Sequence, residues 1–161
     1  MIGETMHVEI DDIDRRIIAE LMDNARRPAK ELAQIVGIHP NTLLQRIKRL
    51  EREELIRKYT IIPDYDKLGY EMFAIIGIKT ETVPGWEGKL KRQVGRHPEI
   101  VSFLLVSGDY DAIAIVRCRN KKHMADLLRE LQNNEAVGKS ITFIVLDSIK
   151  ASEEYNPFRV K

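Results

Sequence analysis

Apolar residues in the first third of the chain recur every three or four positions, which is the spacing of one face of a helix. Three such stripes cover residues 13–21, 29–36 and 40–53. Aspartates before the first stripe are well placed to cap a helix, and Gly37 ends the second. Two helices joined by a short turn that contains a glycine predict a helix-turn-helix. The next segment, LIRKYTII over residues 55–62, has strand-like residues and two basic ones, which predicts a small wing.

The second half of the chain mixes strand and helix patterns. Dense apolar runs bounded by turn residues predict strands at 71–80, 100–107, 112–119 and 140–149. Stripes at helical spacing lie between them, at 86–94 and 124–131. The order βαββαβ is the split arrangement of a ferredoxin-like domain. The expected fold class is therefore α+β.

The same patterns divide the chain into two expected domains. Residues 1–60 form the winged helix-turn-helix, residues 61–69 a linker, and residues 70–161 the ferredoxin-like βαββαβ domain. No apolar run approaches the roughly 18 residues of a membrane span, and the acidic start lacks the apolar core of a signal peptide. Cys118 is the single cysteine, so a reducing cytosol fits. A cytoplasmic protein without a membrane partner is expected.

Charge is balanced overall but concentrated locally. A formal net charge of +1 argues against a uniformly basic, nonspecific binder of nucleic acid. Residues 44–58 nevertheless hold six basic side chains against three acidic ones, and the acidic residues of EIDDID lie near the start of the chain. Positive charge therefore gathers on and just after the third helix.

A helix that enters the major groove of DNA must bury one side and present polar side chains on the other. Leu43, Ile47 and Leu50 keep the helical spacing needed for packing. The residues suited to base edges near the helix start are Asn41, Thr42 and Gln45. The long cations that can reach phosphates are Arg46, Lys48, Arg49, Arg52, Arg57 and Lys58. Leu44 lies off the apolar stripe and fits equally a contact to a thymine methyl and a plain hydrophobic edge.

The same charges also suit a solvated helix face, on which Lys and Glu pairs add a small local stabilisation. For an isolated helix that interpretation is favoured. Three helices in succession, a turn glycine and a basic strand-like segment together favour double-stranded DNA as the partner.

Several segments together resemble the Lrp/AsnC family, the feast/famine transcriptional regulators: DDIDRRII, ELAQIVGI, PNTLLQRIKRLE, LIRKYT and SGDYDAIAIVR. The resemblance runs from Ile10 to Ala151 and keeps the family's order of parts. A helix-turn-helix alone is weak support. Its combination with a βαββαβ domain, called RAM-type in this family, is specific.

The resemblance implies a transcriptional regulator that binds promoter DNA. It also implies homodimers formed through the C-terminal domain, often assembled into higher oligomers, and a small-molecule effector such as an amino acid, bound between dimers. The effector positions, by match to the family's motif, are Ser107, Gly108, Asp109, Tyr110 and Asp111. Ser140 and Thr142, on one face of the last strand, match a hydroxyl-rich position of some relatives.

Three positions depart from the family pattern. Glu54 stands where the family usually has glycine, and a left-handed backbone costs a non-glycine residue about 1–2 kcal/mol, so a differently shaped turn is expected. His39 replaces the usual serine cap, which predicts a weaker helix start. Gln45 stands where relatives often carry arginine, so the preferred DNA sequence is not carried over.

The SGDYD segment also has a plain interpretation, because Gly-Asp between two apolar runs signals a hairpin turn. Turn amides can instead hold a ligand carboxylate while an aspartate holds the ammonium group of the same ligand. With the family resemblance, the effector-binding interpretation is slightly favoured over the plain turn. No nucleophile or base accompanies the aspartates, and the histidines lack metal-ligand spacing. No enzyme activity, metal or cofactor is therefore expected. The alternative to DNA binding is a ligand-sensing or assembly module whose N-terminal domain docks protein.

Overall fold

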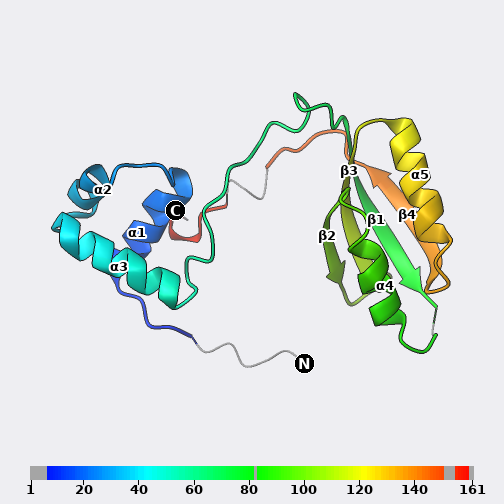
Figure 1. Cartoon of the computed structure of the whole chain (residues 1–161), viewed down its shortest axis with the longest axis horizontal. Helices are drawn as coiled ribbons and strands as arrows, with labels where there is room; N and C mark the ends of the chain where they lie inside the picture. The colour runs from blue at the N-terminus through cyan, green and yellow to red at the C-terminus, as the bar shows by residue number, and fades with distance from the viewer. Residues whose placement is uncertain (1–6, 82, 151–154, 160–161) are drawn as a thin grey trace. The chain divides into compact units, whose positions relative to one another are not determined.

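The computed structural model describes residues 7–81, 83–150 and 155–159. Residues 7–62 with 150 and 155–159 form one unit, and Pro63–Ile149 form the other. Each unit has its own hydrophobic core, and Figure 1 labels its helices and strands. None of the helices in these ranges is long and apolar enough to span a bilayer.

Three helices build the N-terminal unit: α1 (Asp12–Asp23), α2 (Ala29–Val36) and α3 (Pro40–Arg52). A reciprocal capping box starts α1. The Asp11 carboxylate accepts from the Asp14 N–H at 2.8 Å, and the Asp14 carboxylate accepts from the Asp11 N–H at 3.2 Å. Gly37 ends α2 in the left-handed conformation, with φ 83°. The expected helix-turn-helix is confirmed.

The apolar stripes of these helices meet in one core. Its buried members are Ile17, Leu32, Ala33, Val36, Leu43 and Leu50. Ile56, which follows α3, packs against the same core and donates its N–H to the Leu50 carbonyl at 3.0 Å. The chain leaving α3 is therefore tied back onto the helix bundle.

The expected wing is wrong as a strand, since residues 55–62 form none. Ile61 and Ile62 are 80% and 63% exposed, and among the described residues no strand pairs with this segment. A strand needs a neighbour to satisfy its backbone, so strand-like residues alone do not make one.

The turn after α3 is left-handed despite lacking a glycine. Glu54 has φ 55°, so the expectation of a differently shaped turn is wrong. The Glu54 N–H donates to the Glu51 carbonyl at 3.0 Å, and the buried side of Ile56 lies just beyond. Closing the helix end and burying Ile56 together hold Glu54 in this conformation.

A segment from the far end of the sequence completes the N-terminal unit. The short 3-10 helix η2 (Pro157–Arg159) lies against α1. The Asn156 side-chain amide donates to a main-chain carbonyl of α1 and to the Asp23 carboxylate, both at 3.0 Å. The Arg159 guanidinium pairs with Glu20 and with Asp23, each at 2.7 Å.

Two expected boundaries differ from this arrangement. Residues 155–159, expected in the C-terminal domain, group with the helices, and residues 151–154 and 160–161 lie outside the described residues. The expected linker contains no helix or strand, yet from Pro63 onward it groups with the sheet unit. There the Arg117 guanidinium stacks 4.3 Å from the centre of the Tyr65 ring.

The second unit has the expected order βαββαβ: β1 (Met72–Thr80), α4 (Trp86–Val94), β2 (Ile100–Leu105), β3 (Ala112–Cys118), α5 (Lys121–Gln132) and β4 (Val137–Ile144). The strands form one antiparallel sheet in the order β2-β3-β1-β4. Strand β4 begins at Val137, before the expected Ser140. Lys139 pairs with Lys79 and Val137 with Thr80, and the register shifts between these two pairs.

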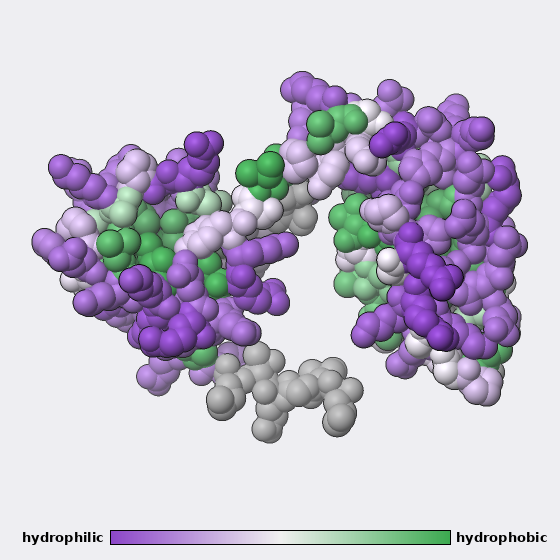
Figure 2. Space-filling model, viewed as in Figure 1, coloured by the Kyte–Doolittle hydropathy of each residue, from purple (hydrophilic) through white to green (hydrophobic). Residues whose placement is uncertain are grey.

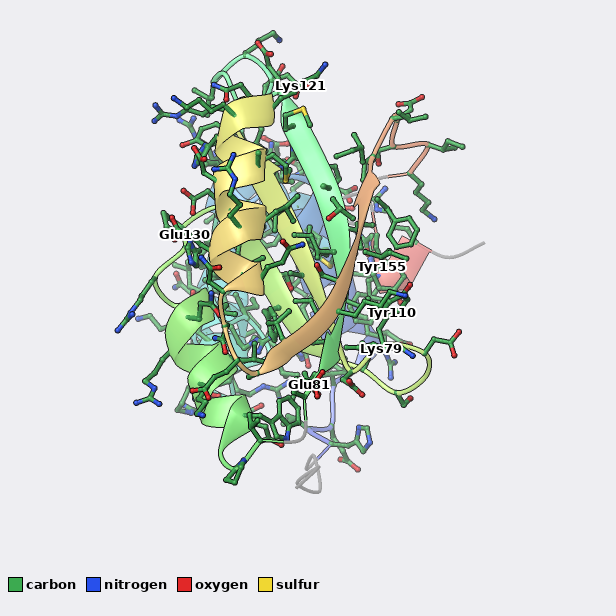
Figure 3. The ribbon with its side chains drawn as sticks, turned by 90° about the vertical axis from the view of Figure 1, so that its right-hand side faces the viewer. Lys79, Glu81, Tyr110, Lys121, Glu130 and Tyr155 are labelled. Carbon is green, nitrogen blue, oxygen red and sulfur yellow. The ribbon has the colours of Figure 1, made fainter. Side chains whose placement is uncertain are left out.

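Both helices cover the same face of the sheet (Figures 1 and 3). Strand β3 buries alternate residues against them, ending with Cys118, which is fully buried as expected. Trp86 packs against this core, as expected of an anchor between helix and sheet. The other face carries exposed apolar side chains, among them Leu104, Ile141 and Phe143. Apolar surface along one side of this unit is green in Figure 2.

Candidate nucleic-acid interface

Helix α3 buries one side and presents another. Leu43 and Leu50 are fully buried, and Ile47 packs against the same core. The exposed side chains near its N-terminal end are Asn41, Thr42, Leu44 and Gln45. This end of the helix therefore offers amide, hydroxyl and methyl groups of the kind that meet base edges in a major groove.

The start of α3 is capped by a residue that is unusual in this role. Pro40 occupies the first helical position, where its fixed φ suits the helix and its missing N–H costs nothing. The His39 ring accepts a hydrogen bond from the Asn41 N–H through Nδ1, at 3.2 Å. The bond lies at the long end of the ordinary range.

Two of the expected phosphate-binding arginines are held inside the unit. Arg46 Nη1 lies 2.8 Å from Asp14 Oδ1 and 2.7 Å from Asp11 Oδ2. Arg49 Nη2 lies 2.5 Å from Asp14 Oδ2. The Asp14 side chain is only 1% exposed. Its carboxylate accepts hydrogen bonds from both arginines and from the Asp11 N–H.

These contacts also stabilise the charged forms. The Asp14 N–H, and after it Arg46, hold the pKa of Asp11 below its ordinary value. Hydrogen bonds to Asp11 and then to Asp14 raise the pKa of Arg46 further. Asp11 and Arg46 therefore remain ionised at neutral pH, and each of the two arginines already faces a carboxylate.

The remaining expected cations point to solvent. Lys48, Arg52, Arg57 and Lys58 are all exposed. Arg52 lies 3.9 Å from Glu53 with 74% of its side chain exposed, and such a surface pair is weak. No described carboxylate lies within 4.0 Å of the charged nitrogens of the other three. These four side chains therefore carry exposed positive charge on the surface of the unit.

Tyr59 fixes the segment that follows α3 to the helix. Its hydroxyl donates to Glu51 at 2.8 Å. Burial, and then this bond to a carboxylate, raise the pKa of Tyr59 to about 12. The neighbouring Arg57 and Lys58 are thus carried on a segment that is tethered at two points, Ile56 and Tyr59.

The expected effector turn joins β2 to β3. Ser107, Gly108 and Asp109 are exposed, and no described residue accepts a hydrogen bond from their main-chain N–H groups. Asp111 is instead engaged within the chain: Oδ2 accepts from the N–H of Thr80 at 2.7 Å and from its hydroxyl at 3.1 Å. These two bonds hold the pKa of Asp111 below its ordinary value.

Tyr110 lies on the sheet face away from the helices. Its ring covers Gly77, where a Cβ would stand 2.9 Å from Tyr110 Cδ1 and Cε1. Figure 3 labels Tyr110 beside Lys79, on the side of the sheet opposite α5. Only a glycine on β1 lets the ring lie this close.

Ser140 and Thr142 share one face of β4, as expected, but it is not the face of Tyr110. In the antiparallel pairing they stand opposite Ile78 and Ile76, which are buried beneath the helices. Residues directly opposite in such a pair point to the same side. Within one chain, the structure therefore separates these hydroxyls from the Tyr110 side of the sheet.

Two family models match the chain. The AsnC-type helix-turn-helix domain matches residues 10–51, and the Lrp/AsnC ligand binding domain matches residues 73–155. Together they cover most of the sequence. The chain belongs to the Lrp/AsnC family. Its helical unit is the DNA-binding domain of a transcriptional regulator, and its sheet unit is the ligand-binding domain.

Curated relatives match the sequence of this Lrp/AsnC protein along nearly their whole length. An uncharacterised HTH-type transcriptional regulator of Pyrococcus furiosus is 32% identical over 93% of this chain and 100% of its own. The HTH-type transcriptional regulator FL11 of Pyrococcus horikoshii is 32% identical over 92% of this chain and 97% of its own.

Solved structures agree in fold. E. coli AsnC superposes with a TM-score of 0.82 at 26% identity, covering 89% of this chain and 97% of its own. A transcriptional regulator of Neisseria meningitidis, solved as a complex with L-Met, gives a TM-score of 0.86 at 22% identity, covering 89% and 94%.

The sequence patterns did not single out one residue of the DNA-binding domain, the buried Asp14. Asp14 falls on the same helical stripe as Ile17 and Leu21, at spacings of three and seven. A carboxylate at a buried stripe position needs cationic or N–H partners, because an unpaired buried charge is costly. A carboxylate at a buried stripe position is therefore the sequence signal that marks Asp14 in this Lrp/AsnC protein.

Proposed function

We propose that this Lrp/AsnC protein reads duplex DNA through helix α3, with base contacts from Asn41, Thr42 and Gln45. One observation carries the proposal: these three side chains are exposed together at the N-terminal end of a helix whose opposite face is packed. In the helix-turn-helix mode, this end of the second helix meets base edges in the major groove.

Contacts to phosphates are assigned to Lys48, Arg52, Arg57 and Lys58. Their exposure and lack of strong carboxylate partners support this assignment. Arg46 and Arg49 are given a supporting role instead, because both already pair with the buried Asp14.

The functional form is proposed to be a homodimer or a larger assembly. The helix-free face of the sheet supports it, since Leu104, Ile141 and Phe143 are 48%, 39% and 52% exposed there. Contiguous apolar surface of this kind marks an interaction site. A dimer would place two α3 helices on half-sites separated by about 34–36 Å or a multiple of it.

The effector is proposed to be an amino acid held at the turn Ser107–Tyr110. Exposed main-chain N–H groups there suit a carboxylate, and Asp109 is an exposed carboxylate that suits an ammonium. The L-Met bound to the Neisseria meningitidis regulator supports the chemical class. Asp111 shapes the turn by bonding Thr80, and Ser140 with Thr142 would join only through a second copy.

Effector binding would alter DNA binding by favouring one assembly or one separation of the DNA-binding domains. A ligand can shift such an equilibrium only by its difference in affinity between the two states. Such a regulator acts in the cytoplasm with the DNA, and neither a cofactor nor an enzymatic activity is proposed.

Selection from a random duplex pool, with and without mixed amino acids, tests this function. We expect a two-fold symmetric motif that changes when Asn41, Thr42 or Gln45 is replaced by alanine. Absence of enrichment under both conditions would reject DNA reading and favour an N-terminal domain that docks protein.

Salt dependence tests the phosphate contacts. Lys48→Ala and Arg52→Ala should each lower the slope of log affinity against log salt by about 0.9, one released counterion each. Lys67→Ala is the control, because Lys67 is also an exposed cation but pairs with Asp64 in the sheet unit. Slopes equal to that of the control would show that Lys48 and Arg52 do not touch phosphate.

A further inference from the structure

Asp14 is a fully buried carboxylate in a DNA-binding domain that is otherwise packed with apolar side chains. It lies in the first turn of α1, at the third position after the cap. Its charged partners, however, come from α3, more than thirty residues away in sequence. The side chain thus connects the first helix to the helix proposed to read DNA.

The geometry of the connection is specific. Oδ1 receives Arg46 and Oδ2 receives Arg49, so the two oxygens are used by residues three positions apart on α3. Residues at this spacing are neighbours on one helix face, about one turn apart. A carboxylate gripped at both points resists both rotation of α3 about its axis and sliding along it. The Asp11 N–H fixes the carboxylate itself from the α1 side.

We propose that Asp14 is a positioning residue for DNA recognition, which sets the rotation of α3 and withholds Arg46 and Arg49 from DNA phosphates. This inference rests on the proposed reading of DNA by α3. Because Arg46 and Arg49 pair with a carboxylate of the same chain, their positive charge contributes less to the nonspecific attraction of DNA. Sequence preference then comes from a helix held in one orientation, and nonspecific affinity is kept low.

A merely structural role would lower the amount of folded protein and weaken every complex by the same factor. The positioning role predicts a different pattern. Without the carboxylate, α3 is less well oriented, so each mispositioned base contact weakens the specific complex by about tenfold. Arg49 becomes available to phosphates of any sequence and adds about 0.9 to the salt slope, whereas Arg46 keeps its contact with Asp11. The ratio of specific to nonspecific affinity is therefore the deciding quantity.

The experiment compares Asp14→Asn with Asp12→Asn in the full chain. Asp12 is the matched control, since it lies in the same helical turn and is 93% exposed, and among the described residues Arg15 is its one ion-pair partner. Each protein is titrated with the selected duplex and with an unrelated duplex of equal length, at several salt concentrations. We expect Asp14→Asn to lose at least tenfold in the ratio and to bind the unrelated duplex with a steeper salt slope, while Asp12→Asn keeps both wild-type values. Equal weakening on both duplexes, or an unchanged ratio, would overturn the positioning role.

A milder variant covers the case in which Asp14→Asn does not fold. Arg49→Lys keeps the positive charge and leaves Arg46 on Asp14. The single lysine nitrogen, however, cannot face both Asp14 and Glu53 as Nη2 and Nε of Arg49 do. Its ratio should fall while that of Arg15→Lys, at an exposed position of α1 outside the proposed DNA contacts, should not. Equal ratios for these two variants would also overturn the inference. If the wild-type protein prefers neither duplex, the proposed DNA reading fails and this inference falls with it; a preference that survives in Asp14→Asn rejects the positioning role alone.

Discussion

Replacing Glu54 by glycine should stabilise the DNA-binding domain. Glu54 holds φ 55°, in the left-handed region that disfavours a Cβ. Relief of that conformation is worth about 1–2 kcal/mol. The unfolded chain gains backbone freedom with glycine, which takes back about 0.5–1 kcal/mol. The expected net gain is about 0.5–1 kcal/mol, which corresponds to roughly 2–8 °C in the melting temperature of so small a domain.

The choice of probe matters for this measurement. Trp86 is the single tryptophan and packs in the sheet unit, so its fluorescence reports the wrong domain. Hydrogen exchange of the α3 amides, for example that of Leu50, reports the opening of the helical unit directly. Glu54→Gly should slow this exchange about two- to five-fold, the factor that corresponds to the expected gain in free energy.

Two control variants separate backbone strain from charge. Glu54→Ala keeps the Cβ and removes the carboxylate, so it should leave stability unchanged. Glu53→Gly changes a residue with φ −84°, where glycine brings no relief and should cost about 0.5–1 kcal/mol. A gain in Glu54→Ala equal to that in Glu54→Gly would assign the effect to charge, and no gain in Glu54→Gly would refute the strain argument.

Two predictions concern the sheet unit. Gly77→Ala should destabilise it by about 1–3 kcal/mol in urea unfolding, because the new methyl meets the Tyr110 ring, whereas Gly88→Ala, with nothing within 4 Å in α4, should stabilise it by up to about 1 kcal/mol. Equal effects would show that Tyr110 yields freely. Asp111→Asn should flatten the loss of stability in acid, since the pKa of Asp111 is lowered from 3.8 by its bonds to Thr80. That contribution is present above pH 3.8 and disappears as pH falls through the lower folded value; identical acid unfolding curves would contradict it.

Hydrophobic spacing was sufficient to predict the helices and strands, because the signal for each lies within its own residues. The stripe ending at Leu50 and the alternation through Cys118 both match the buried positions. The wing failed for the opposite reason. Residues such as Ile61 and Ile62 have a high propensity for strands, but a strand forms only when a second strand pairs with its backbone. Among the described residues no strand pairs with this segment.

Site residues were predictable by type but not by partner. The exposure of Asn41 and Lys48 follows from helical geometry alone. The pairing of Arg46 with Asp14 depends on how α1 and α3 cross, which no local pattern specifies. The sequence predicted the strand of Ser140 correctly. It did not predict that Ser140 and Tyr110 lie on opposite faces of the sheet, because the face of a residue is defined only once the strands are paired.

The return of residues 155–159 onto α1 makes the DNA-binding domain discontinuous, with the whole sheet unit inserted between its two parts. A growing chain on the ribosome thus exposes its helices early, yet it lacks Asn156 and Arg159 until the sheet unit has been synthesised. Domains generally fold as units, in order of synthesis. In this protein the first domain to emerge is completed last, so its final contacts with α1 form only after the ligand-binding domain exists.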